Sequence, residues 1–160
     1  MTDMLVKLYT LPPLEPEWAA MQAQGVRVRR GMPPEKHRVT SWVRHEFDEV
    51  WQSETEVAFA HVPVSCWIAV QANAVIGFAC YDTSAKGFFG PIGVGSASGK
   101  RGVGRALLIA TLHAMRSEGY GYAIIGGVGP VDFYQKTVGA TLIPDSTPGV
   151  YDGMLGEDEH

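Results

Sequence analysis

The chain has 160 residues, of which 46% are hydrophobic and 19% are charged, and its formal net charge is -4. This composition describes an ordinary globular protein, long enough for one domain over residues 1–160, and its mild acidity argues against general nucleic-acid binding. No apolar run is as long as a membrane span and the first ten residues lack a signal-peptide layout, so we expect a cytoplasmic protein without a membrane partner.

The first third of the chain is predicted to contain short strands and two helices. Leu5 to Leu11 is a strand candidate that ends at two prolines, and Glu15 to Gln24 has helical character. Valines alternate with arginines over residues 26–29, which is typical of a charged edge strand. A longer helix is predicted from Glu35 to Gln52, because apolar residues recur there at helical spacing: Val39, Trp42, Val43, Phe47, Val50 and Trp51.

The middle of the chain is predicted to be rich in strands. Cys66 to Val70 and Val75 to Tyr81 are apolar runs joined by a short link that suits a hairpin, and Phe88 to Val94 follows after a turn. The first two runs hold the only cysteines, Cys66 and Cys80. We expect these to be buried free thiols rather than a disulfide, as is usual in a reducing compartment.

The last third begins with a helix from Gly102 to Glu118, which is apolar on most of its circumference and therefore expected to be buried against a sheet. Tyr122 to Val128 is the next predicted strand, and Pro130 and Gly139 suit the two ends of a further helix. The final predicted elements are the strands Leu142–Ile143 and Tyr151–Leu155 and a solvated acidic tail at residues 156–159. This order of elements indicates a mixed α/β domain.

The segment from Pro91 to Leu108, PIGVGSASGKRGVGRALL, indicates an anion site. An apolar strand runs into small residues and then into a helix whose start carries only Gly102 and Gly104 around one valine. Such a start leaves backbone N–H groups bare, and the helix dipole adds partial positive charge, so a phosphate or pyrophosphate fits there. Three basic residues surround the same place in a chain of negative net charge: Lys100, Arg101 and Arg105.

Two familiar phosphate-binding motifs do not fit this segment. A P-loop would need glycine where Val94 stands and serine or threonine where Arg101 stands. The dinucleotide fingerprint would need a small residue where Leu107 stands, and the next acid, Glu118, comes too early.

The same segment resembles the coenzyme-binding motif of the GNAT N-acetyltransferase family, Arg/Gln-x-x-Gly-x-Gly/Ala after a strand. Gly102 and Gly104 stand on the two small positions, and Val94 stands on the valine at the strand end. Gly99 replaces the Arg/Gln, so that side chain is missing, and Lys100 and Arg101 are candidates to supply its charge.

A second block, Tyr122 to Ala140, is similar to the fifth strand and following helix of that family. It carries the ending FY-x-K-x-x-GA on Phe133, Tyr134, Lys136, Gly139 and Ala140. Gly127 stands where the family commonly has asparagine.

The resemblance implies a GNAT fold, that is, a mixed, mostly antiparallel central sheet flanked by helices, with strands 4 and 5 of the family splayed apart. It implies transfer of an acetyl group from acetyl-CoA to a primary amine of a small molecule or peptide, by direct attack in a ternary complex, without a metal and in a protein that can form a homodimer. The coenzyme contacts that it assigns are Ile92, Gly93, Val94, Gly99, Lys100, Arg101, Gly102, Val103, Gly104 and Arg105.

The resemblance makes Tyr134 the general acid that protonates the departing thiolate. The base is left open: Asp82 lies at the end of a predicted strand but also suits a turn, Glu35 and His37 follow a Pro-Pro break, and a water chain is a further possibility. Two alternatives to an enzyme remain at this point. One is a non-catalytic acyl-CoA-binding module on the same fold, and the other is a nucleotide-binding domain.

Overall fold

The computed structural model describes residues 1–156, and a single mixed sheet lies at the centre of this part of the chain. In residues 1–156 its strand order is β2-β3-β4-β5-β6-β1-β7. All neighbouring strands pair antiparallel except β5 and β6, which pair parallel. The strands are β1 (Met4–Lys7), β2 (Arg27–Arg30), β3 (Cys66–Gln71), β4 (Ala74–Tyr81), β5 (Phe88–Val94), β6 (Tyr122–Ile125) and β7 (Thr141–Leu142).

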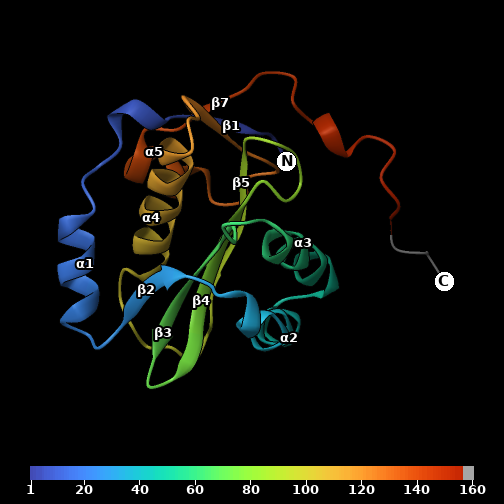
Figure 1. The fold of residues 1–160 in the computed structure, drawn as a ribbon. Helices are drawn as coiled ribbons and strands as arrows, with labels where there is room; N and C mark the ends of the chain where they lie inside the picture. The colour runs from blue at the N-terminus through green and yellow to red at the C-terminus, as the bar shows by residue number, and fades with distance from the viewer. Residues whose placement is uncertain (157–160) are drawn as a thin grey trace.

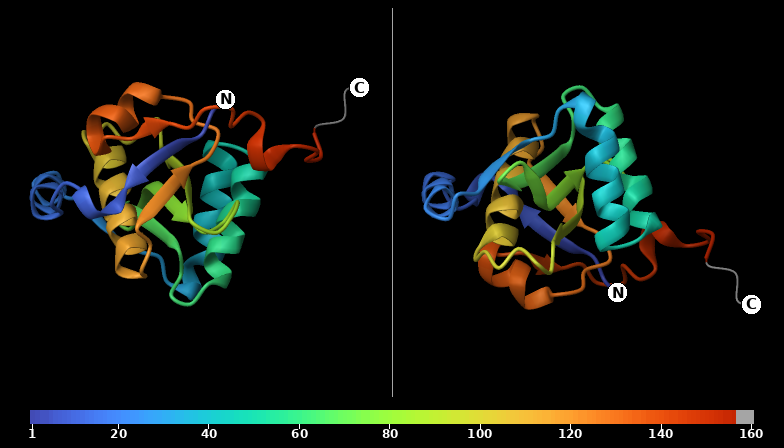
Figure 2. Two further views of the ribbon diagram at one scale, coloured as in Figure 1. Left: turned by 90° about the horizontal axis from the view of Figure 1, so that it is seen from above. Right: turned by 90° about the horizontal axis from the view of Figure 1, so that it is seen from below.

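Helices cover both faces of the sheet, α1, α4 and α5 on one face and α2 and α3 on the other (Figure 1). The views from above and below show the same two layers, with the C-terminal segment leaving the body on the α2 and α3 side (Figure 2). The helices are α1 (Glu15–Gln22), α2 (Lys36–Glu46), α3 (Glu49–Ala60), α4 (Val103–Ser117) and α5 (Val131–Val138), with 3-10 turns at Leu8–Thr10, Pro33–Glu35 and Gly149–Tyr151.

The arrangement confirms the expected fold class, including the splay between two central strands. β5 pairs with β6 at only two positions, Phe88 with Ile124 and Phe89 with Ile125. On its other side β5 stays paired with β4 as far as Val94. The two strands therefore separate after Phe89, where Gly90 has a φ of 123° and the β4–β5 register shifts.

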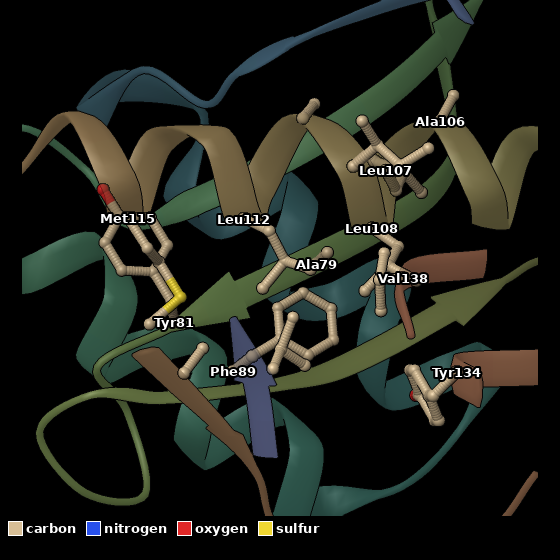
Figure 3. Packing of buried hydrophobic residues seen from close by; sticks show 14 of the residues in the cluster. Ala79, Tyr81, Phe89, Ala106, Leu107, Leu108, Leu112, Met115, Tyr134 and Val138 are labelled. Carbon is tan, nitrogen blue, oxygen red and sulfur yellow. The ribbon is translucent and has the colours of Figure 1, made fainter. Parts of the chain in front are cut away.

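The main core lies between α4 and the sheet. Ten of the fifteen residues of α4 are buried, which explains why its sequence is apolar on most of its circumference. Figure 3 shows Leu107, Leu108 and Leu112 of this helix above Ala79 and Phe89 of the sheet. The approach is close, because a Cβ built on Gly77 of β4 would lie only 2.9 Å from Leu107 Cδ1.

A second core on the opposite face is aromatic. Trp42, Phe47 and Trp51 come from α2, the α2–α3 junction and α3, and all three rings lie within 6.1 Å of the Phe78 ring of β4, centroid to centroid. The Phe47 ring lies directly on Gly93 of β5, where any Cβ would collide with it. Gly93 therefore lets the α2–α3 junction rest on the sheet.

The predicted single helix from Glu35 to Gln52 is wrong, because the chain breaks at Phe47 and continues as α3 to Ala60. Asp48 is in an extended conformation and its Oδ1 accepts a hydrogen bond from the Trp51 N–H at 2.8 Å, which caps the new helix. The apolar spacing persists across the break, since both helices face the same core.

Several element ends also differ from the predictions. The first strand stops at Lys7 and turns into a 3-10 helix, and β6 ends at Ile125 rather than Val128. The predicted strand Tyr151–Leu155 is wrong: a 3-10 turn occupies Gly149–Tyr151, and Gly149 and Gly153 have φ values of 61° and 75°, which no strand adopts. The predicted acidic tail lies outside the described residues from position 157 onward.

We expect Leu107→Ala to lower the free energy of unfolding by about 2–5 kcal/mol, because it removes a fully buried side chain between α4 and β4. Urea unfolding followed by circular dichroism measures the change. Val57→Ala, at an exposed position of α3, is the control and should change stability by no more than about 0.5 kcal/mol. Equal losses in the two variants would contradict this assignment of the core.

Candidate functional site

The gap between β5 and β6 exposes main-chain hydrogen-bonding groups of β5. The Gly95 N–H donates to the Ile76 carbonyl at 2.8 Å, so Gly95 points toward β4. Because residues of an antiparallel ladder alternate between facing the partner and facing away, Gly93 also faces β4. Ile92 and Val94 face the opposite side, where residues 1–156 place no paired strand beyond Phe89. Ile92, Gly93 and Val94 are the residues of this strand that are predicted to contact the coenzyme. Of these, Ile92 and Val94 offer their peptide groups to the gap, and Gly93 does not.

The far wall of the gap is the segment that follows β6. The Gly127 N–H donates to Asp3 Oδ1 at 2.9 Å and its φ is 57°, so the chain turns away from β5 there. Gly126 is covered by the Tyr151 hydroxyl and by the Phe88 ring, and a Cβ on it would collide with the hydroxyl. This bend is the local reason why β6 ends after Ile125 and the strands separate.

The loop between β5 and α4 ends in a cluster of unpaired donors. Gly99 and Gly102 have φ values of 62° and 75°, conformations that favour glycine. The first main-chain hydrogen bond of α4 is made by the Ala106 N–H, which donates to the Gly102 carbonyl at 3.0 Å. Within the described part of the chain, the N–H groups of residues 102–105 have no acceptor. The helix start is thus built as the sequence predicts, with donors free for an anion.

Gln24 at the end of α1 fixes this loop, a contact that the sequence did not indicate. Its Nε2 donates to the Arg101 carbonyl at 2.7 Å and its Oε1 accepts from the Arg101 N–H at 2.9 Å. The two residues are 77 positions apart, so no local pattern connects them. The clamp satisfies both main-chain groups of Arg101 and leaves those of the following residues open.

The three basic residues of the loop are not equivalent. The Arg105 Nε donates to Glu17 Oε1 at 2.8 Å, and Glu17 is nearly buried, so much of that charge is neutralised within the protein. Lys100 and Arg101 form no salt bridge with any residue in 1–156. The positive charge available to a ligand therefore comes mainly from Lys100 and Arg101.

Tyr134 lies on α5, and Figure 3 shows it with Phe89 in the main apolar cluster. Ile125 belongs to the same cluster, and Ile92 and Val94 pack against it. It is 5% exposed and its hydroxyl forms no hydrogen bond with the described residues. Burial raises the pKa of Tyr134 to about 12, because the charged phenolate would lose hydration. The hydroxyl is therefore protonated at neutral pH and free to donate.

Asp82 holds the turn between β4 and β5. Its Oδ1 accepts from the Gly87 N–H at 2.7 Å and its Oδ2 accepts from the Tyr120 hydroxyl at 2.8 Å. Asp82 follows the pairing of Tyr81 with Phe89, whereas the α4 loop follows Val94, about 16 Å further along β5. Both Asp82 oxygens thus take part in the turn, and the role of Asp82 as a base facing the acceptor stays a prediction.

Glu35, a further candidate near the N-terminal helices, is also engaged, and so are two arginines of β2. Glu35 forms a two-point salt bridge with Arg29, at 2.7 and 2.6 Å, and this pairing lowers the pKa of Glu35. Arg30 donates to the Val64 carbonyl and the Tyr81 hydroxyl, and it stacks on the Trp67 ring at 5.3 Å. These arginines of the edge strand β2 therefore have structural partners.

Residues 1–156 hold no group of three or more histidine, cysteine, aspartate or glutamate side chains arranged to bind a metal. In the same part of the chain, every helix is too short or too polar to cross a membrane.

The model of the Acetyltransferase (GNAT) family matches residues 36–140. No curated protein matches the sequence. Among solved structures, a GCN5-related glucosamine N-acetyltransferase region of a fungal multi-domain β-N-acetylglucosaminidase is similar over 89% of this chain and 19% of its own, with a TM-score of 0.73 and 15% identity. A GCN5-related N-acetyltransferase from Sphaerobacter thermophilus is similar over 89% of this chain and 48% of its own, with a TM-score of 0.65 and 19% identity.

A GCN5-related N-acetyltransferase from Kribbella flavida has a TM-score of 0.57 and 12% identity over 88% of this chain and 53% of its own. The chain thus spans between a fifth and about half the length of these structures. At such low identities the likeness shows a common fold.

We expect Asp82→Ala to lower the free energy of unfolding by about 1–3 kcal/mol, because the Gly87 N–H and the Tyr120 hydroxyl both lose their acceptor. Chemical unfolding monitored by fluorescence measures it. Asp152→Ala removes an exposed carboxylate without a hydrogen bond and serves as the control. A change in Asp82→Ala as small as in the control would refute the turn role.

Proposed function

Because the chain belongs to the GNAT acetyltransferase family, we propose that it transfers the acetyl group of acetyl-CoA to a primary amine of a small molecule or peptide. The proposal rests on two sets of free main-chain groups that follow one another along the gap. The peptide groups of Ile92 and Val94 face the gap, and the unpaired N–H groups of residues 102–105 follow at its end. An elongated ligand with an amide-containing arm and a diphosphate fits this order of groups.

The residues present fit the coenzyme at both ends. The N–H groups of residues 102–105 and the charges of Lys100 and Arg101 would hold the diphosphate, and the peptide groups of Ile92 and Val94 would pair with the pantetheine amides as an added strand. Bound there, acetyl-CoA supplies the acetyl group as an activated thioester. Tyr134 belongs to the apolar cluster beside the same strand, on the α4 and α5 face.

Tyr134 would act as the proton donor for the departing sulfur. Its pKa of about 12 keeps the phenol protonated at neutral and mildly alkaline pH, while a thiol has a pKa of about 8.5 in water. Because the phenol is the weaker acid of the two, proton transfer to sulfur is uphill and is completed when the tyrosinate takes up the surplus proton of the amine nitrogen. Direct hydrogen bonding would then stabilise the thiolate until transfer is complete.

The protein itself need not provide a nucleophile, because the amine attacks directly. Cys66 and Cys80 are both fully buried, and burial raises the pKa of the Cys66 thiol, so neither offers an accessible thiolate. In the reaction the amine nitrogen forms a bond to the acyl carbon, and the bond from carbon to sulfur breaks with its electron pair on sulfur. Tyr134 then gives its proton to that sulfur, and the tyrosinate takes back the surplus proton of the amide nitrogen.

A non-catalytic acyl-CoA-binding module is the second candidate, favoured by the engagement of both Asp82 oxygens in the β4–β5 turn, which gives that carboxylate a structural role. Calorimetry with CoA, followed by thiol-release measurements with acetyl-CoA and a panel of primary amines, distinguishes the two. Binding together with amine-dependent thiol release supports the transferase. Binding with no release for any amine supports the module, and absence of CoA binding refutes both.

Tyr134→Phe should lower kcat by about 10²-fold or more, because the ring remains but the proton donor is lost. The dissociation constant for CoA should stay within about twofold, since the hydroxyl is not among the groups that hold the diphosphate. Steady-state kinetics and calorimetry give the two values. Unchanged turnover would contradict the role of the hydroxyl, and a parallel loss of CoA affinity would indicate a structural role instead.

The double variant Lys100→Ala/Arg101→Ala should weaken CoA binding by about 10-fold at low ionic strength and by less in high salt, because it removes the two unpaired charges beside the diphosphate. Arg105→Ala should weaken binding less than the double variant, since Glu17 already neutralises that guanidinium. Arg116→Ala, at the opposite end of α4, is the control. Equal affinities in all three variants would exclude this loop as the diphosphate site.

A further inference from the structure

A polar cluster lies on the α2 and α3 face of the sheet, opposite the helices α4 and α5. The Ser84 hydroxyl donates a hydrogen bond to Glu54 Oε1, which joins the β4–β5 loop to α3. Burial raises the pKa of the Tyr151 phenol in the C-terminal 3-10 turn; Ser84 opposes this effect and the charge of Glu54 adds to it, so both residues act on that phenol. Three segments far apart in sequence thus bring one carboxylate and two hydroxyls together.

This cluster borders the place where β5 and β6 separate. The Tyr151 hydroxyl lies on Gly126, the residue that follows the last β6 position paired with β5. A Cβ on Gly126 would collide with that hydroxyl and would also lie 3.1 Å from the Phe88 ring at the start of β5. Figure 2 shows the C-terminal segment on the same side of the sheet as α3. The cluster is therefore at the mouth of the gap, on the face that Tyr134 does not occupy.

The carboxylate of Glu54 is half-buried and lacks a cationic partner in the described residues. The salt bridges within 1–156 join other pairs. The charged group that acts on Glu54 is the acid Asp48, and those that act on Tyr151 are the acids Glu54 and Asp3. Burial, with a contribution from Asp48, raises the pKa of Glu54 against the opposing effect of the Ser84 hydrogen bond. A partly desolvated carboxylate that feels a second acid and has no cationic partner in the described residues is a place that a cation would stabilise.

We infer that Glu54, Ser84 and Tyr151 form the subsite for the acceptor, and that the acceptor is a primary alkylammonium bound there as a cation. The inference rests on the proposed function, since it places the second substrate of that reaction. Glu54 and the two hydroxyls supply acceptors to the three N–H bonds of an ammonium group. The subsite is adjacent to the gap, where the thioester carbon must lie.

The same carboxylate serves as the proton acceptor. Glu54 takes one proton from the ammonium nitrogen, and the neutral amine that results forms the bond to the acyl carbon as the bond to sulfur breaks. The sulfur takes the Tyr134 proton, and the remaining surplus proton on nitrogen returns to the tyrosinate. Glu54 then releases its proton to solvent, so the products are the amide, the free thiol and one proton.

The test compares Glu54→Gln with Glu56→Gln. Glutamine keeps the volume of Glu54 and can still accept the Ser84 hydrogen bond, while removing the charge and the proton acceptor. Glu56 is an exposed acid two residues further on the same helix and provides a matched change in net charge. Calorimetry with n-butylamine, on protein saturated with CoA, measures binding. Kinetics with n-butylamine and acetyl-CoA separate the KM of each substrate.

For Glu54→Gln we expect n-butylamine to bind about 10-fold or more weakly, its KM to rise accordingly, and the KM for acetyl-CoA to stay unchanged. Glu56→Gln should match the natural protein. Tyr151→Phe, which keeps the ring on Gly126, should give a smaller loss in n-butylamine affinity, because one acceptor is removed without the charge.

Three results would overturn the subsite: no heat with n-butylamine in the natural protein, equal affinities in the Glu54 and Glu56 variants, or a loss of acetyl-CoA affinity equal to that for the amine. The failure of the proposed function looks different. Binding of n-butylamine that depends on Glu54, with no thiol release for any amine, would preserve the subsite and refute the transferase.

Discussion

The short pairing between β5 and β6 is the constraint on which this structure depends. Two parallel positions hold these strands together, and after Phe89 the main chain of β5 has a partner on one side only. Unpaired peptide groups within a sheet are costly when buried and attract another strand when exposed. The fold keeps this opening because the residues around it enforce it: Gly90 turns β5, and Gly126 accommodates the Tyr151 hydroxyl as the chain leaves β6.

The loop at the end of the gap shows how the protein concentrates positive potential without a positive net charge. Gln24 binds both main-chain groups of Arg101, and Glu17 binds Arg105, so part of the loop is satisfied internally. Within residues 1–156, the groups that remain free are the N–H groups of residues 102–105 at the start of α4 and the charges of Lys100 and Arg101. Because α4 packs closely on β4 through Gly77, these N–H groups are held at a fixed place relative to β5. Rigid placement matters, since donors that need not reorganise bind an anion with less loss of entropy.

Short sequence patterns predicted much of the fold and of the N–H donor site. Contacts between residues far apart in the sequence could not be predicted from them. Gly102 precedes the first residue of α4 and Gly139 follows the last residue of α5, with φ values of 75° and 67°. These helix ends could be predicted because they depend on the conformation of the glycine itself. The break between α2 and α3 has another cause: Phe47 rests on Gly93, which lies 46 positions later and leaves no trace in the helical spacing. The clamp from Gln24 to Arg101 is equally non-local. The sequence around Tyr151 suggests a strand, but Gly149 and Gly153, two positions away on either side, have positive φ values and turn the chain.

Burial prepares two groups for opposite tasks on the two faces of the sheet. Desolvation disfavours the charged form of any acid, so it raises the pKa of Tyr134 on one face and that of Glu54 on the other. For the phenol this means that the proton is present at neutral pH. For the carboxylate it means a greater tendency to accept a proton from a neighbouring ammonium group. An amine entering from the α3 face and a thioester lying in the gap would therefore meet between a proton acceptor and a proton donor. The opening between β5 and β6 allows both substrates to reach that point, because an intact sheet would separate them.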